Sequence, residues 1–129
     1  MILLDTHVLV WANLSTKKLS RPAASAIRRA RAGGGLAISA VSLLELARLI
    51  SANRVGIRGT VRETIDSLTQ GVQIKPVTSE IAALTAYLPA DFPSDPADRA
   101  IAATAQAEGI SLVTADERIQ ACSLVKTIW

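Results

Sequence analysis

The chain of 129 residues is poor in cysteine, histidine and aromatic side chains, and each shortage excludes a class of protein. A lone Cys122 excludes an internal disulfide and most structural zinc sites, and it is typical of a reducing compartment. No segment reaches the roughly 18 apolar residues that span a bilayer. No basic region precedes the apolar N-terminal run, which Asp5 interrupts too early for a signal peptide. We therefore expect a cytoplasmic protein that does not enter the membrane.

Aliphatic side chains are what the chain has in abundance. Hydrophobic residues make up 50% of the sequence, whereas aromatic residues make up only 3%. A core of Ala, Leu, Ile and Val suits parallel strands covered by Ala-rich helices. A chain of this length can bury such a core as one unit, so we expect a single domain over residues 1–129.

The net charge of +3 conceals a strong asymmetry between the two halves of the chain. Residues 1–62 hold ten Lys and Arg against two acids, whereas residues 63–129 hold four against nine. The basic half could attract a polyanion, while the other half concentrates carboxylates. A solvated basic surface explains the first half equally well.

Short apolar runs alternate with helical patterns along the whole chain. Five strands are expected, at Ile2–Asp5, Leu36–Ser39, Val72–Val77, Ser111–Thr114 and Val125–Ile128. Helices are expected after Thr6 to about Asn13, from Ser20 to the glycines 33–35, at Val41–Ala52, from Thr60 to about Gln70, and at Thr78–Leu88, Asp98–Glu108 and Asp116–Cys122. The stretch Thr60-Val61-Arg62-Glu63 matches a capping box. This alternation predicts an α/β fold with a parallel sheet of four to five strands and helices on both faces.

Four acids stand where such a fold would place functional groups. In parallel sheets, ligands bind beyond the carboxyl ends of the strands. Asp5 ends the first strand, and Asp116 follows the fourth by two residues. Glu45 lies in an apolar helix, on the face of Val41 and Leu49, and Asp98 precedes the Ala-rich face of a later helix.

Each acid alone also has a purely structural explanation. Asp5 and Asp116 could cap the helices that follow them, and Asp98 could favour a helix N-terminus. Glu45 could pair with Arg48 or Arg99. Together, however, four carboxylates on one edge would repel one another unless a cation neutralised them. Oxygen ligands without Cys or paired His indicate Mg²⁺, with Mn²⁺ as a possible substitute, rather than zinc.

Four segments carry a resemblance to a known family. LLDTHVLVW, SAVSLLELARL, DPADRAIAATA and LVTAD occur in the order and at the spacings of PIN-domain ribonucleases. The chain most resembles the VapC-type toxins of type II toxin–antitoxin pairs, and the resemblance covers essentially its whole length. It implies a PIN-like three-layer sandwich. One departure is Ala97, where the family often has a large aromatic residue.

The resemblance also implies an activity and a site. Asp5, Glu45, Asp98 and Asp116 would bind the metal and carry catalysis, with Asp5 and Asp98 as the principal ligands. Metal-assisted hydrolysis of RNA would leave a 5′-phosphate and a 3′-hydroxyl. Accessory residues would be Thr114 beside the metal or its water, Asp95 in the loop motif Asp95-Pro96, and Arg99 on the scissile phosphate or paired with Glu45.

Partners follow from the charge pattern and from the resemblance. Arg28, Arg29 and Arg31 are candidates for holding the RNA backbone. The resemblance implies a small cognate antitoxin, a homodimer and a toxin–antitoxin hetero-oligomer. The apolar segments Val41–Ala52 and Thr78–Leu88 are candidates for those contacts, although ordinary burial also explains them.

Four further residues are interpreted as structural. Trp11 and Trp129 are expected in the core or an interface, Cys122 in packing, and His7 as structural because it has no second His at ligand spacing. His7 could otherwise make a minor contact with the substrate.

Two rival functions stay open. A non-catalytic PIN-like module would bind RNA or protein without cleaving it. A phosphoaspartate receiver or phosphatase would also place an acid after the first strand. The phosphatase needs a second Asp where this chain has His7, and the receiver needs an acid pair and a Lys after a late strand, where Lys126 lies inside the strand instead.

Overall fold

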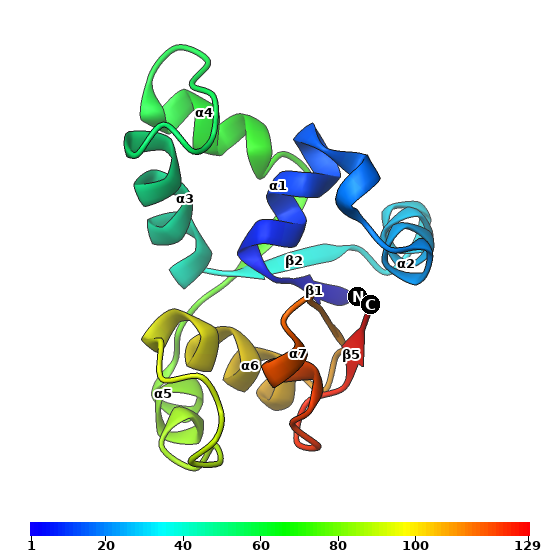
Figure 1. Ribbon diagram of the computed structural model, residues 1–129, viewed down its shortest axis with the longest axis vertical. Helices are drawn as coiled ribbons and strands as arrows, with labels where there is room; N and C mark the ends of the chain where they lie inside the picture. Colours follow the sequence, from blue (N-terminus) through cyan, green and yellow to red (C-terminus); the bar gives the residue numbers. More distant parts are fainter.

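The computed structural model describes all residues, 1–129, and shows alternating strands and helices with both chain ends beside the sheet (Figure 1). In chain order the elements are β1 (Ile2–Leu4), α1 (Thr6–Leu14), the 3₁₀ helix η1 (Thr16–Lys18), α2 (Arg21–Ala32), β2 (Leu36–Ser39), α3 (Val41–Ser51), α4 (Val61–Leu68), β3 (Val72–Lys75), α5 (Ser79–Thr85), α6 (Pro96–Glu108), β4 (Leu112–Val113), α7 (Glu117–Gln120) and β5 (Thr127–Ile128).

The sheet has five parallel strands in the order β3-β2-β1-β4-β5. In register, Leu3 of β1 lies between Ala37 of β2 and Leu112 of β4. The predicted parallel α/β sheet is therefore confirmed, and β1 is its central strand. Because all strands point the same way, the residues that follow β1 and β4 leave the sheet at the same edge.

Two hydrophobic cores lie on opposite faces of this sheet. Successive side chains of a strand point to opposite faces. Leu4 accordingly belongs to a core with residues of α1, α2, α3 and α4, whereas Leu3 belongs to a second core with residues of α6 and α7. Figure 1 shows these two groups of helices above and below the strands. The layers are held together by the sheet between them.

Short polar side chains fix where the helices begin. The Ser20 hydroxyl accepts a hydrogen bond from the N–H of Ala23, as expected for a helix that starts just before Pro22. The Thr60 and Glu63 side chains form the predicted capping box of α4. The Thr78 hydroxyl caps α5 by accepting a hydrogen bond from the N–H of Ile81.

Several predicted boundaries differ from the structure. Helix α6 begins at Pro96 rather than Asp98, because the Asp95 carboxylate caps it and proline suits its first turn. Strand β3 ends at Lys75, before Pro76, which has no N–H to donate. The strands β4 and β5 have two residues each, and η1 was not predicted.

None of the helices has both the length and the hydropathy that crossing a bilayer requires.

Candidate active site

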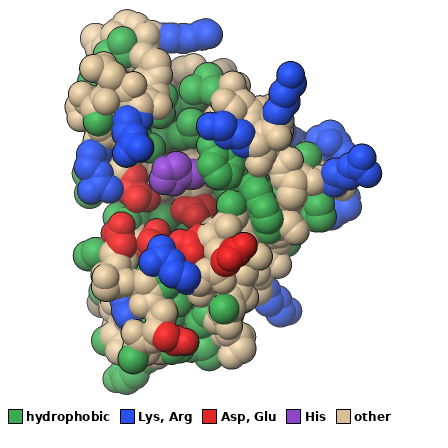
Figure 2. Space-filling model, viewed as in Figure 1, with side chains coloured by type: hydrophobic (Ala, Val, Ile, Leu, Met, Phe, Trp, Pro, Cys, Tyr) green, Lys and Arg blue, Asp and Glu red, His purple; other side chains and the backbone are tan.

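One pocket, of about 450 Å³, lies at the edge where β1 and β4 end. All four predicted acids line it, together with Asp95. The remaining lining residues are His7, Val8, Trp11, Arg48, Ala115 and Arg118. Figure 2 shows the acidic side chains gathered in a hollow at the middle of one face, beside the only histidine of the chain. We call this the carboxylate pocket.

Asp5 has its two carboxylate oxygens occupied by different donors. Oδ1 accepts from the Thr6 N–H at 2.8 Å, which caps α1, and Oδ2 accepts from the Thr114 hydroxyl at 2.8 Å. Burial raises the pKa of Asp5, although these two hydrogen bonds oppose the rise. The hydrogen bonds fix the orientation of a carboxylate that burial would otherwise neutralise.

Glu45 is tied to the first turn of α1 through the fully buried Thr6. The Thr6 hydroxyl donates to Glu45 Oε1 at 2.5 Å, while the Thr6 backbone N–H donates to Asp5 Oδ1. The partner of Glu45 Oε2 is Arg48, at 3.9 Å in a loose and exposed ion pair. A single threonine thus positions two acids that lie far apart in sequence.

Asp98 lies in the first turn of α6 and has no hydrogen-bond donor of its own. Burial, and after it the charges of Asp5, Asp95, Glu45 and Asp116, together raise its pKa to about 7. Three of these carboxylates come from other segments of the chain, and Asp95 is the N-cap of the same helix. Asp98 is therefore the acid whose pKa is raised by all the other acids of the pocket.

Asp116 is held by Arg118, two residues later. Its Oδ1 accepts from the Arg118 N–H at 2.9 Å, and its Oδ2 lies 3.1 Å from the guanidinium. Partial burial raises the pKa of Asp116, but the hydrogen bonds and charge of Arg118 outweigh it and keep this pKa below its usual value. Asp116 stays ionised when Asp98 is half protonated.

The donor set of the pocket suits a hard divalent cation. It supplies carboxylate oxygens with no thiolate, and burial and the neighbouring acids raise the pKa of one of its carboxyls, that of Asp98. No three His, Cys, Asp or Glu side chains are arranged to hold an ion as they stand. Mg²⁺ keeps several waters and needs one or two direct carboxylates, so a partly formed shell fits it.

The accessory residues have separate positions. Thr114 contacts Asp5 directly, and Asp95 caps α6 through the Ala97 N–H at 2.9 Å while its side chain also lines the pocket. Arg99 does not line the pocket and is not paired with Glu45. Its guanidinium donates to the Thr85 carbonyl at 3.0 Å. The guanidinium carbon lies 5.7 Å from the ring centre of Phe92. Because α6 turns Arg99 toward α5, it anchors that helix instead.

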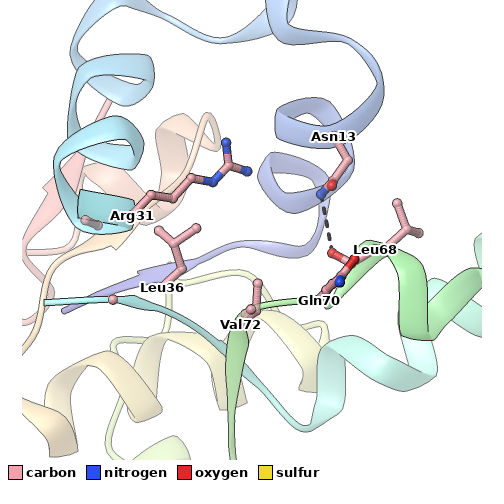
Figure 3. A pocket seen from close by; sticks show the side chains of 9 residues that line it. Asn13, Arg31, Leu36, Leu68, Gln70 and Val72 are labelled. Atoms are coloured by element: carbon pink, nitrogen blue, oxygen red, sulfur yellow. Dashed lines mark hydrogen bonds between the residues drawn. The ribbon is translucent and has the colours of Figure 1, made fainter. Parts of the chain in front are cut away.

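The Arg-rich stretch of α2 lies far from the carboxylates along the sheet. Arg31 lines a separate pocket of about 290 Å³ with Leu36 and Val72, the first residues of β2 and β3. Figure 3 shows Arg31 reaching over this pocket, opposite Asn13, whose amide donates to the Leu68 carbonyl at 3.3 Å. This is the opposite edge of the sheet from the carboxylates, so an RNA bound here would have to pass around the molecule to reach them.

The sequence analysis did not assign three residues to the site: Arg118 and Trp11, which line the pocket, and Thr6, which hydrogen-bonds Asp5 and Glu45 from behind it. Thr6 and Arg118 adjoin predicted acids in the sequence, at Asp5-Thr6 and Asp116-x-Arg118. A polar residue within two positions of a predicted site acid could therefore have been predicted to position that acid. Trp11 gave none, since a tryptophan one turn along an apolar helix is equally expected in a core.

Comparisons with known proteins identify the family of the chain. The PIN domain family matches residues 2–123. Ribonuclease VapC22 of Mycobacterium tuberculosis (strain ATCC 25618 / H37Rv) is 39% identical over 119 residues, which cover 92% of this chain and 89% of the relative.

Solved structures share the fold. One is the crystal structure of VapBC2 from Rickettsia felis bound to a promoter DNA fragment. It matches with a TM-score of 0.75 at 18% identity, over 98% of this chain and 97% of that chain. FitAcB from Neisseria gonorrhoeae matches with a TM-score of 0.68 at 21% identity, over 98% and 96% of the two chains. Both likenesses support the three-layer α/β sandwich.

Proposed function

The chain belongs to the PIN domain family, and from this premise we propose that it is a metal-dependent ribonuclease acting as the toxin of a toxin–antitoxin pair. The carboxylate pocket carries the proposal: Asp5, Glu45, Asp98 and Asp116 reach it from four separate segments, and burial together with the charges of the neighbouring acids raises the pKa of Asp98 to about 7. The likeness to Ribonuclease VapC22 supports hydrolysis of RNA phosphodiester bonds as the reaction.

Mg²⁺, or Mn²⁺ in its place, would be held by these four acids. Bound there, the ion would lower the pKa of a water for in-line attack and stabilise the charge that develops on the phosphate. Asp5 and Asp98 are proposed as its principal ligands. Positive charge favours the ionised carboxyl, so binding would release the proton that Asp98 holds near neutral pH.

The surrounding residues keep the acids in position. Thr114 and the Thr6 backbone fix Asp5, and the Thr6 hydroxyl fixes Glu45. Arg118 fixes Asp116 and also brings a positive charge to the rim of the pocket. A phosphate oxygen entering the pocket would meet this guanidinium, which donates bidentate hydrogen bonds to phosphates well.

A small antitoxin is the proposed protein partner, in a hetero-oligomer. The structural neighbours include toxin–antitoxin complexes from several bacteria, which supports this class of partner. An acidic pocket without its cation attracts Lys or Arg. We therefore infer that an antitoxin cation inserted there would exclude the metal. Homodimer contacts through Val41–Ala52 and Thr78–Leu88 stay a prediction; Leu44 in α3 is 73% exposed, and Tyr87, just after α5, is 79% exposed.

The experiment compares wild type with Asp98→Asn in an RNA cleavage assay, with Mg²⁺ and with EDTA. We expect Asp98→Asn to lower the cleavage rate at least ~100-fold, because it removes one negative ligand that the ion requires. Chelation should abolish cleavage by the wild type. Asp91→Asn is the matched control, since it removes an exposed carboxylate that does not line the pocket.

Other outcomes would favour the rival functions. Equal cleavage by both proteins, or cleavage that persists in EDTA, would contradict the mechanism. No cleavage of any RNA, with no heat of Mg²⁺ binding in calorimetry, would favour a non-catalytic binding module. An acid-labile aspartyl phosphate formed from a small phosphodonor would favour a receiver or phosphatase, although no lysine lines the pocket.

A further inference from the structure

A groove of about 340 Å³ adjoins the carboxylate pocket and shares His7 and Trp11 with it. It lies between α1, η1 and the turn that follows α3. We call it the Trp11 groove. Its lining includes Val10, Trp11, Leu14, Lys18, Leu49 and Arg54. Because the two cavities have lining residues in common, a polymer held at the carboxylates can continue into the groove.

Trp11 presents a ring to the groove within a small aromatic cluster. Its ring centre lies 6.1 Å from that of His7 and 5.9 Å from that of Trp129. Its side chain is only partly buried, although it packs against the core. The Lys18 ammonium lies 5.9 Å from the ring centre on a flexible exposed side chain. A flat ligand could displace Lys18 and stack on the indole.

The charge of the groove is opposite to that of the pocket. Lys18 and Arg54 line the groove, and no acid does. Neither cation takes part in an ion pair. Arg54 is placed by the turn that ends α3, where Asn53 has φ 58° and the Arg54 N–H donates to the Leu49 carbonyl at 2.9 Å. The groove therefore offers an aromatic face and two cations without ion-pair partners within one cavity.

We propose that the Trp11 groove binds the RNA nucleotide next to the bond that is cut, with its base against Trp11 and its phosphate between Lys18 and Arg54. This inference rests on the proposed ribonuclease function and assigns a substrate subsite to it. An aromatic face beside paired cations is the arrangement that binds single-stranded nucleic acid with little sequence preference.

Continuity with the carboxylate pocket favours RNA over a protein occupant. A peptide could also use the passage shared through His7 and Trp11, but one that carries a cation into the carboxylate pocket would meet only like charges, Lys18 and Arg54, in the groove. An RNA strand needs that passage, because its neighbouring nucleotides must leave the pocket on one side or the other. The opposite route toward Arg31 would lead around the sheet to its other edge.

Fluorescence of Trp11 gives a direct test of binding. The chain has two tryptophans, so an Asp98→Asn/Trp129→Phe protein reports on Trp11 alone and should not cleave. It is titrated in Mg²⁺ with a mixed-sequence single-stranded RNA 12-mer and, separately, with inorganic polyphosphate. We expect the RNA to quench Trp11 and polyphosphate to leave its emission unchanged, because only RNA supplies a base that stacks.

Variants of the groove separate stacking from charge. Trp11→Leu should weaken RNA binding about tenfold, and Trp11→Phe should restore most of it. Lys18→Ala and Arg54→Ala, both at exposed positions, should each lower the slope of log Kd against log salt by about 0.7. The matched control is Arg62→Ala, which removes an exposed positive charge outside the groove. It should leave the slope of log Kd against log salt unchanged.

Kinetics of the otherwise wild-type protein distinguish this inference from the proposed function. We expect Trp11→Leu to raise KM for RNA with little change in kcat, and Trp11→Phe to be close to wild type. Cleavage with unchanged KM in all groove variants would overturn the subsite and leave the ribonuclease function standing. RNA that fails to quench Trp11, while an acidic peptide does quench it, would also overturn the subsite and assign the groove to a protein. Quenching by RNA without any cleavage would support the groove and contradict the ribonuclease function.

Discussion

The acids of the carboxylate pocket differ in how their charge is compensated. Asp116 has the guanidinium of Arg118, and Asp5 has hydrogen bonds from Thr114 and from the Thr6 backbone. Asp98 has no such donor and faces the other acids. Since like charges disfavour ionisation, Asp98 is the group whose charge state depends most on whether a cation is present.

A pH dependence of stability follows at this scale. The pKa of Asp98 is about 7 in the folded protein against a usual 3.8, so the folded state keeps a proton that the unfolded state has lost. Without metal, stability should therefore fall as pH rises from about 4 through 7. Because Asp98 is partly exposed to water, we expect a loss on the order of 1–2 kcal/mol from this group.

Urea denaturation in EDTA at pH 5 and pH 8 measures this effect. Asp98→Asn should reduce the decline in the free energy of unfolding between the two pH values, whereas Asp91→Asn should not. The comparison between the two variants isolates Asp98 from Asp5, whose raised pKa acts in the same direction. Equal pH dependence in wild type and Asp98→Asn would contradict the assignment.

At the scale of the elements, helix caps place the functional residues. Asp5 and Asp116 each cap the helix that follows a strand and also line the carboxylate pocket. The structural explanation that the sequence left open is thus correct for both, and it does not exclude the functional one. A cap sits where a strand ends and a helix begins, which in a parallel sheet is also where ligands bind.

The capping box of α4 is a stability device away from the pocket. Glu63 N–H donates to the Thr60 hydroxyl at 3.1 Å, and Thr60 N–H donates to Glu63 Oε1 at 3.2 Å. Thr60→Ala should lower the free energy of unfolding by about 1 kcal/mol, since it leaves a helix N–H without its partner. Urea denaturation checks this, with Thr60→Ser expected to stay near wild type. RNA cleavage should be unchanged in both, because α4 does not line the carboxylate pocket.

At the scale of the whole molecule, the site depends on both layers of helices. Glu45 comes from α3, whose Leu46 and Ile50 fill one core, and Asp98 comes from α6, whose Ile101 fills the other. The two acids meet only because both helices begin at the same edge of the sheet. Packing on each face of the sheet therefore contributes to the alignment of the carboxylate pocket.

Leu3 and Leu4 test whether the two cores unfold together. They are adjacent in β1 and fully buried, yet they belong to different cores. Leu3→Ala and Leu4→Ala should each cost about 2–5 kcal/mol, and each should shift a single unfolding transition, because one sheet supports both cores. Circular dichroism and tryptophan fluorescence during urea denaturation should give coincident curves. Separate transitions for the two probes would show that the cores are independent.

The sequence by itself was enough for the fold and for the identity of the acids. The strand Leu36–Ser39 and the capping box at Thr60 have the predicted positions, because these features depend on residues close together in the chain. The start of α6 was wrong by two residues, although Asp95-Pro96 is a local signal for a cap followed by a first turn. Whether the predicted acids act as ligands stays a prediction.

Only the tertiary structure decided which residues surround those acids. Thr6 donates hydrogen bonds to both Asp5 and Glu45, Arg99 donates to the Thr85 carbonyl instead, and Arg31 of α2 lies at the opposite edge of the sheet. Lys18 and Arg54, which no motif singled out, lie beside the pocket instead. The physical reason is that charge and hydrogen-bond partners act over a few ångströms in space, and the order of strands in the sheet determines which distant segments come that close.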